Sequence, residues 1–335
     1  MAAFRVLQPG LFTTIQDLGR YGYESQGVPT SGAMDEFAFR VANILLGNEE
    51  NAPALEITML GPTLEVLEDV AVAITGAQLP VEVNGKKRTV WTSFPLKKGD
   101  VLSLGAVSSG CRAYLAVNGG FKADVAMGSA STYTRGKLGG LEGRPLKKED
   151  LLFRELGNKP ARFYRVDERY VPTYKNVAEI GVILGPQDDY FDEENIRLFL
   201  NSTYAITKDS DRMGYRLEGP QIRAKQKHDI ITDGIVPGVI QVPASGNPII
   251  MLKDAQTTGG YAKIATCIWS DLPKLAQLKP GDKVKFIAIS VEEAQKLLGD
   301  MENSIEQIKA TLRGVRYFDV SVNGKHYDVV LESID

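Results

Sequence analysis

The chain has 335 residues, which at ~150 residues per domain predicts about two domains. Its 39 basic and 42 acidic residues give a net charge of −3, so there is no basic surplus to bind a phosphate backbone, and nucleic acid is excluded as a partner. No apolar run approaches the ~18 residues of a membrane span. The N-terminus, Met1–Arg5, lacks the apolar core of a signal peptide. We therefore expect a cytoplasmic protein that does not enter a membrane.

The two cysteines, Cys111 and Cys267, each lie in an apolar stretch, which predicts two buried, reduced thiols. The only two histidines are His228 and His326. These four residues cannot supply a zinc site, and the histidines do not suggest a catalytic triad. We expect no metal site in this chain.

The 33 glycines favour short strands separated by turns, and therefore a mainly β fold with a few helices. The first predicted helix has apolar residues at helical spacing between Met34 and Leu45, with Ser31 as its cap and Gly47 as its stop. The second predicted helix covers Asp192–Leu200 and follows acidic residues that suit a helix N-terminus.

Two further helices are predicted near the C-terminus, each from a capping-box pattern. One starts after Ser290 and stops at Gly299, and the other starts after Ser304 and stops at Gly314. Beyond them, Phe318–Leu331 is typical of a β-hairpin.

The two halves of the chain share short patterns. Residues 96–104 and 278–286 each place a Gly-Asp turn before an alternating strand, and residues 60–64 match residues 218–222 around a Gly-Pro pair. These matches indicate two related β-barrels built from one ancestral unit, joined by a polar linker at residues 156–172.

Several loops combine glycine with charged, amide and hydroxyl side chains, which suits close contact with a ligand. They cover residues 16–35, 210–216, 232–243 and 253–263. A structural alternative stays open, in which Asp and Gly only form turns and Arg–Asp pairs lock the loops. The sequence Gly-x-x-x-x-Gly-Lys-Ser/Thr is absent, so the chain is not a self-sufficient ATPase of that type.

Five of these motifs, in this order, make the chain similar to the allophanate hydrolase subunit 2 family over residues 3–290. They are Gln16–Arg20, Gly27–Asp35, Ser210–Gly214, Asp233–Gly238 and Gln256–Tyr261. The resemblance implies two tandem cyclophilin-like β-barrel domains in a mainly β chain. The expected division is a first barrel at 1–160, a second at 161–290, and a helical segment with a hairpin at 291–335.

The resemblance also implies a function in a complex. Members of the family include components of bacterial ATP-dependent 5-oxoprolinase, which converts 5-oxo-L-proline to L-glutamate. The implied partners are a KipI-like B subunit and a LamB/YcsF-like A subunit, with ATP and Mg²⁺ shared by the complex, and the chain is expected to be inactive alone. Two alternatives remain: a regulator that binds a KipI-like inhibitor of a sporulation kinase, and a biotin-dependent amide or urea carboxyltransferase subunit.

The C-terminal hairpin bears on the biotin alternative. Phe318–Leu331 resembles the opening hairpin of a biotinyl carrier domain, but the chain has no Ala-Met-Lys-Met acceptor. We therefore expect no covalent biotin.

Activation of a lactam by ATP needs a cation for the developing negative charge and a carboxylate for orientation or Mg²⁺. We assign the first role to Arg212 and the second to Asp211 and Asp254, and expect their loops to converge on one pocket. In the alternative, Arg212 only forms a salt bridge with Asp254 and braces two loops. The expected substrate-binding residues are Gln241, Gln256, Thr257, Thr258, Tyr261 and Lys263.

Overall fold

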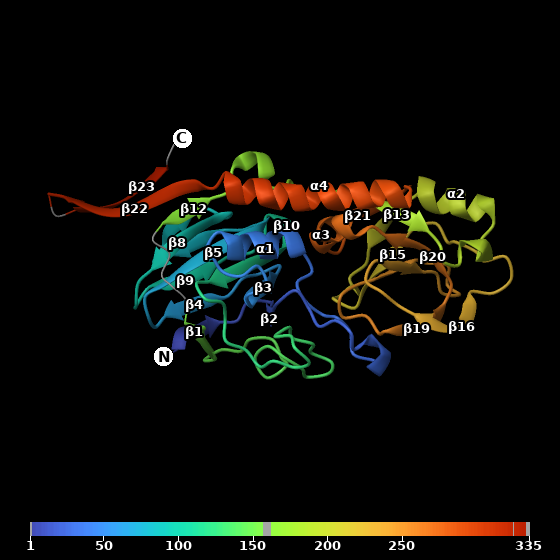
Figure 1. The fold of residues 1–335 in the computed structure, drawn as a ribbon, viewed down its shortest axis with the longest axis horizontal. Helices are drawn as coiled ribbons and strands as arrows, with labels where there is room; N and C mark the ends of the chain where they lie inside the picture. The colour runs from blue at the N-terminus through green and yellow to red at the C-terminus, as the bar shows by residue number, and fades with distance from the viewer. Residues whose placement is uncertain (1, 157–161, 324, 333–335) are drawn as a thin grey trace. The chain divides into compact units, whose positions relative to one another are not determined.

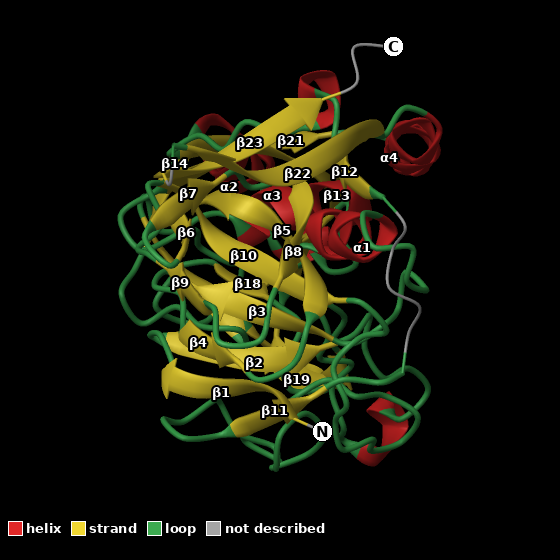
Figure 2. Ribbon diagram, turned by 90° about the vertical axis from the view of Figure 1, so that its left-hand side faces the viewer, coloured by secondary structure: helices red, strands yellow, loops and turns green. Residues whose placement is uncertain are grey.

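The computed structural model describes residues 2–156, 162–323 and 325–332 (Figure 1). The chain divides into two compact units, each assembled from separate stretches of sequence. Unit 1 contains residues 1–18, 36–173 and 303–335, and unit 2 contains residues 19–35 and 174–302. Strands dominate and helices are few, as Figure 2 shows, which confirms the predicted mainly β fold with tandem barrel-like units.

Unit 1 is built from two sheets around one apolar core. Phe4 and Leu64 from the first sheet and Phe94 and Leu115 from the second are fully or almost fully buried there, because alternate residues of each strand face inward. The first sheet has the order β11 (Leu151–Phe153), β1 (Ala2–Gln8), β4 (Thr63–Val66), β9 (Val101–Leu104), β6 (Val81–Val83), β7 (Lys86–Arg88). The second has the order β2 (Phe12–Gln16), β3 (Ala54–Thr58), β10 (Ser109–Val117), β5 (Val70–Gln78), β8 (Thr92–Leu96), β12 (Phe163–Arg165), β22 (Arg313–Val322), β23 (Lys325–Glu332).

Unit 2 contains a closed seven-stranded barrel. Its strands follow the order β13 (Val177–Leu184), β20 (Lys263–Cys267), β17 (Val239–Gln241), β18 (Ile249–Met251), β15 (Gly214–Glu218), β14 (Thr203–Ile206), β21 (Lys283–Ala288). A separate two-stranded ribbon pairs β16 (Asp229–Gly234) with β19 (Thr258–Tyr261). The barrel interior is apolar, with Phe199, Tyr204 and Phe286 in mutual aromatic contact.

The repeated Gly-Asp pattern forms the same turn in both units. In unit 1 the amide of Lys97 donates to Asp100 Oδ2 over 2.7 Å, and in unit 2 the amide of Lys279 donates to Asp282 Oδ2 over 3.0 Å. The preceding glycines, Gly99 and Gly281, have φ of 91° and 93°, a left-handed conformation that costs glycine little. Each turn leads directly into a strand, β9 or β21, as the sequence predicted.

The first two helices lie close to where the sequence placed them. Helix α1 (Glu36–Ile44) ends as predicted, since Gly47 has φ of 67° and its amide donates to the carbonyl of Ile44. Its start was predicted wrongly: Ser31 lies five residues upstream, with φ of 52°, and does not cap the helix. Helix α2 (Glu193–Asn201) is confirmed, with Asp192 accepting from the amide of Asn195.

The two helices predicted near the C-terminus are one helix, α4 (Val291–Ala310). The amide of Glu293 donates to Ser290 Oγ, so the first cap is confirmed. Gly299 lies inside the helix, because a single glycine costs only ~1 kcal/mol there and does not end it. Gly314 lies in β22, beyond the helix end. A short helix, α3 (Leu272–Ala276), was not predicted.

Both cysteines are buried and free, as expected from their apolar surroundings. Burial raises the pKa of the Cys267 thiol far above its ordinary value, so it stays protonated and unreactive. Among the described helices, none combines the length and apolar character needed to cross a membrane.

Candidate functional site

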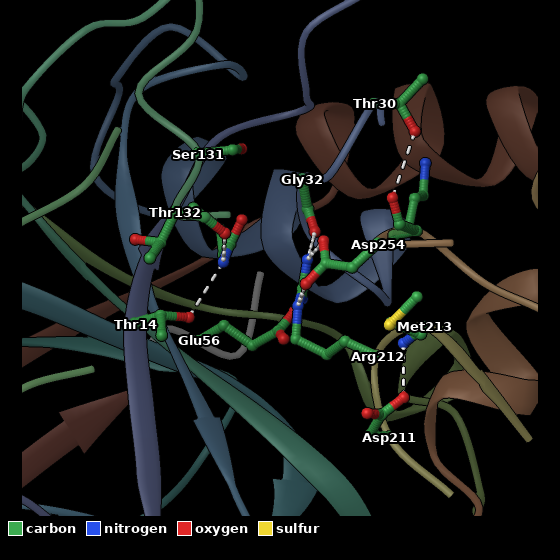
Figure 3. A network of polar contacts seen from close by, with 12 residues as sticks. Thr14, Thr30, Gly32, Glu56, Ser131, Thr132, Asp211, Arg212, Met213 and Asp254 are labelled. Carbon is green, nitrogen blue, oxygen red and sulfur yellow. Dashed lines mark hydrogen bonds and ion pairs between the residues drawn. The ribbon is translucent and has the colours of Figure 1, made fainter. Parts of the chain in front are cut away.

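The centre of the candidate site in unit 2 is an ion pair between Arg212 and Asp254 (Figure 3). Arg212 Nε and Nη2 donate to the two oxygens of Asp254 over 2.8 and 3.0 Å, and both side chains are more than nine-tenths buried. Arg212 Nη2 also donates to the carbonyl of Gly32 over 2.8 Å. The planar guanidinium therefore ties together three segments that are far apart in sequence.

Backbone contacts strengthen this junction. The amide of Asp254 donates to the carbonyl of Arg212, and the amide of Ser31 donates to the carbonyl of Lys253, both over 2.9 Å. Thr30 Oγ1 lies 3.5 Å from the same Lys253 carbonyl. The stretch at residues 253–254 is thus held from two sides, which fixes the loop that follows it.

The third predicted catalytic residue, Asp211, lies at the surface next to this junction. Its Oδ1 accepts from the amide of Met213 over 2.8 Å and from the amide of Gly214 over 3.4 Å, an arrangement that stabilises the turn before β15. Asp254 is engaged by Arg212 through both oxygens, and across the described residues no group of three or more His, Cys, Asp or Glu side chains could hold a metal ion. These carboxylates do not fit a Mg²⁺ site, and we derive no step through one.

A cavity of about 430 Å³ in unit 2 is formed by the loops that flank this junction. Three predicted substrate-binding residues, Gln256, Thr257 and Thr258, line it. The other lining residues are Glu24, Ser25, Pro29, Thr30, Gly234, Ile235, Val236, Pro237, Leu252, Lys253 and Ala255. The volume lies in the range of small-molecule sites, ~300–1,000 Å³, and the mixture of apolar walls with a few polar groups is typical of them.

The remaining predicted binding residues are not among the residues that line this cavity. Gln241 is buried and its Nε2 donates to the carbonyl of Tyr261 over 3.2 Å. Lys263 is 2% exposed, and its Nζ donates to Asp233 Oδ2 over 2.7 Å. The Lys263 hydrogen bond, with the amide of Gly234, lowers the pKa of Asp233. These contacts hold β16, β17, β19 and β20 in place beside the cavity.

Arg212, Asp211 and Asp254 are likewise absent from the cavity lining. The structure brings Arg212 and Asp254 together, and it places Ala255–Thr258 from the same loop in the cavity wall. The two loops therefore meet at the Arg212–Asp254 pair, but the Ser210–Gly214 loop contributes no residue to this cavity wall, and convergence of both loops on one pocket stays a prediction.

Sequence reasoning missed Lys253 as a site residue. The residue is 3% exposed, it lines the cavity, and its Nζ lies 4.4 Å from the centre of the Trp269 ring. A lysine directly after the apolar run Ile249–Leu252 was the available signal, because a charge at the end of a buried strand is held near the barrel rim.

Unit 1 carries a different polar cluster around Asp17. The Asp17 carboxylate accepts from Ser129 Oγ and from the amide of Ala130, each over 2.7 Å, and also from Ser131 Oγ. All four residues are buried. The cluster attaches the loop at residues 129–131 to the end of β2, which is a structural role.

The family model described as carboxyltransferase domain, subdomain A and B, matches residues 26–288. The chain therefore belongs to this carboxyltransferase-domain family. It is similar to the C subunit of 5-oxoprolinase from Escherichia coli (strain K12), with 38% identity over 91% of this chain and 97% of that protein. It is 37% identical to the C subunit of 5-oxoprolinase from Haemophilus influenzae, over 88% of this chain and 94% of that protein.

A solved structure shows the same fold. The chain is similar to the crystal structure of the K. lactis urea amidolyase, with a TM-score of 0.86 and 34% identity. The match covers 92% of this chain and 20% of that chain, so this fold is one part of a much longer protein there. The resemblance drawn from the five loop motifs is confirmed at the level of the family.

Proposed function

We propose that this chain is the C subunit of a 5-oxoprolinase complex, which converts 5-oxo-L-proline to L-glutamate at the expense of ATP. The observation that carries the proposal is its 38% identity to the C subunit of Escherichia coli 5-oxoprolinase, over 91% of this chain and 97% of that protein. Chains that align over nearly their whole lengths have the same domains in the same order, and are expected to occupy the same place in an assembly.

The reaction opens a five-membered lactam whose amide resists attack by water. Transfer of the γ-phosphoryl group of ATP to the lactam carbonyl oxygen releases ADP and makes the ring carbon a better electrophile. Water adds to that carbon, the ring C–N bond breaks with a proton going to nitrogen, and the resulting acyl phosphate is hydrolysed by a second water. The products are L-glutamate, ADP and phosphate.

We place the lactam in the cavity of unit 2. Gln256, Thr257 and Thr258 supply amide and hydroxyl groups to its polar atoms. Arg212 and Asp254 act indirectly: their buried bidentate pair fixes the loop that carries these three residues. We therefore favour the bracing role of Arg212 over a direct catalytic role, because its guanidinium donates to Asp254 and to the carbonyl of Gly32.

ATP with Mg²⁺ is bound by the assembled complex, with a KipI-like B subunit and a LamB/YcsF-like A subunit as partners. The test is reconstitution of the three proteins with 5-oxo-L-proline and ATP, with glutamate release as the readout. We expect glutamate only when this chain is present with its partners, and none from this chain alone. Full turnover without this chain would refute the proposal, and full turnover by this chain alone would refute the dependence on partners.

A second candidate is a carboxyltransferase component, favoured by the family description and by the similarity to the K. lactis urea amidolyase. This candidate requires biotin on another chain, because we propose that this chain carries none. A streptavidin blot of the purified protein tests that proposal. The two functions differ in bicarbonate dependence: oxoprolinase activity needs no bicarbonate and is insensitive to avidin, whereas carboxyl transfer requires bicarbonate and is abolished by avidin.

A further inference from the structure

The cavity wall of unit 2 contains a glycine that neither backbone conformation nor crowding by the described residues explains. Gly234, the exposed last residue of β16, lines the cavity, and its φ lies outside the left-handed range that favours glycine. A β-carbon added to Gly234 meets no heavy atom within 4 Å. Glycine in a strand costs conformational entropy, and it often marks a place where a ligand or another backbone approaches closely.

Two other glycines close to the same ribbon are explained by the chain itself. A β-carbon added to Gly259 would lie 2.6 Å from Gln241 Nε2, so packing on the barrel excludes a side chain there. Gly238 has φ of 94°, a left-handed conformation that glycine adopts at little cost. Gly234 differs from both, because the fold has room for a side chain at this position and the position lies in a cavity wall.

The pairing of β16 with β19 places Gly234 directly opposite Thr258. Residues directly opposite in an antiparallel pair point to the same face, with β-carbons ~4.5–5.5 Å apart. Thr258 is exposed and lines the cavity, so the space left empty at Gly234 adjoins a hydroxyl-bearing side chain. The neighbouring residue Asp233 points to the other face, where it accepts from Lys263 of the barrel. A ligand group that reaches the hydroxyl of Thr258 therefore lies close to the Cα of Gly234.

The wall that continues from Gly234 is apolar and is held in place. Ile235, Val236 and Pro237 follow it in the cavity lining. The amide of Ile235 donates to the carbonyl of Thr257 over 2.9 Å, which ties this stretch to the loop on the other side of the cavity wall. A bare backbone between a hydroxyl and an apolar wall fits a small ring that has polar atoms on one edge and methylene groups on the other.

We propose that Gly234 is a specificity-determining residue, which keeps the space beside Thr258 open for the lactam ring and limits the size of the ring that the cavity accepts. The inference rests on the proposed function, since 5-oxo-L-proline has a five-membered ring with an amide on one edge. The ring lies over the Cα of Gly234, with its amide toward Thr258 and its methylene groups toward Ile235–Pro237. A side chain at position 234 occupies part of the same space.

The experiment measures how two lactams bind to the reconstituted complex, by isothermal titration with 5-oxo-L-proline and with the six-membered 6-oxopiperidine-2-carboxylate. Gly234→Ala should weaken the binding of 5-oxo-L-proline about 10-fold, because one carbon group in a pocket changes affinity roughly 10- to 200-fold. The six-membered ring should lose about 100-fold or more, so the preference for the smaller ring increases. The melting temperature of the variant should equal or exceed that of the wild type, since the added carbon meets no neighbour and restricts the unfolded chain.

Gly299→Ala is the matched control. Gly299 lies within α4, a β-carbon added to it also meets no heavy atom within 4 Å, and it is absent from the cavity lining. This variant should bind both lactams as the wild type does. Gly234→Val adds more volume at the proposed position and should bind neither lactam. Binding of either lactam by Gly234→Val with wild-type affinity would contradict the inference.

Binding and turnover together distinguish this inference from the proposed function. A loss of binding in Gly234→Ala that grows with ring size supports the inference even if the complex never releases glutamate. Glutamate release by a complex in which Gly234→Ala binds both lactams normally overturns the inference and leaves the proposed function standing. The inference is also overturned if the variant loses both lactams equally, if its subunits no longer elute together, which would assign Gly234 to a partner contact, or if the wild type binds neither lactam.

Discussion

Both units bury a carboxylate within polar loops, yet the surroundings of the two carboxylates differ. In unit 1 the carboxylate of Asp17 accepts hydrogen bonds from Ser129, Ala130 and Ser131, which attach a distant loop to the end of β2. In unit 2 the carboxylate of Asp254 faces a guanidinium, and the residues directly before and after Asp254 line a cavity. In both units the buried charge holds together segments that are distant in sequence. Burial of a charge alone therefore does not indicate a binding site, and it is the adjoining cavity in unit 2 that suggests a ligand.

The largest effect is expected from breaking the ion pair of unit 2. Arg212→Met leaves the Asp254 carboxylate buried without its cation and should lower the free energy of unfolding by about 3–5 kcal/mol. Chemical denaturation measures the loss. The double variant Arg212→Met/Asp254→Leu should recover part of it, since removal of both charges also removes the unpaired one. A double variant less stable than Arg212→Met would contradict this explanation, because the unpaired carboxylate would then not be the cause of the loss.

Activity of the Arg212 variant sharpens the same comparison. If the pair braces the cavity loop, turnover in the complex should fall together with binding of 5-oxo-L-proline, because Gln256–Thr258 lose their fixed position. If Arg212 instead stabilises developing charge, kcat should fall about 10²-fold or more at unchanged substrate binding. Titration of the complex with substrate, beside turnover at saturation, separates the two outcomes.

A smaller effect is expected from the cluster of unit 1. Asp17→Ala leaves two hydroxyls and one amide buried without their acceptor, and should cost about 2–3 kcal/mol of unfolding free energy. Ser129→Ala removes one of these donors and should cost about 1 kcal/mol. Because the cluster is structural, the folded Asp17→Ala complex should keep the wild-type KM for 5-oxo-L-proline. A changed KM in a correctly folded Asp17→Ala complex would show that unit 1 contributes to substrate binding.

Local patterns predicted the fold where a few neighbouring residues decide the structure. The Gly-Asp turns before β9 and β21 and the end of α1 at Gly47 depend on local backbone conformation, which the residue types reveal. The local pattern was wrong at Gly299, taken as a helix end, and at Ser304, taken as a helix start. Packing against the rest of the protein continues α4 through both residues. The proposed domain boundaries at residues 160 and 290 stay a prediction.

The sequence predicted which residue types belong to the candidate site, but not how they contact one another. Charged residues in glycine-rich loops pointed to Arg212 and Asp254, and these two residues do meet. The sequence offered both a catalytic role and a salt bridge for these residues and could not decide between them, because the distance between two loops more than forty residues apart depends on the closure of the barrel. The apolar run before Lys253 hints at a buried lysine, but its contact with Trp269 and its place in the cavity wall depend on residues that are distant in sequence.

The smallest expected effect concerns a third charged contact, between Asp233 and Lys263 in unit 2. The Lys263 hydrogen bond lowers the pKa of Asp233 in the folded chain, so the ionised carboxylate stabilises the fold above its unfolded pKa of about 4. This contribution is lost as the pH falls through the lower, folded pKa. Between pH 7 and pH 2 the wild type should therefore lose stability more steeply than Asp233→Asn, when unfolding free energies are measured by denaturation at each pH. Lys263→Met should flatten the acid side of the profile in the same way, because it removes the main cause of the shift. An acid profile that is unchanged in both variants would mean that this half-exposed contact, unlike the buried Arg212–Asp254 pair, contributes nothing to stability.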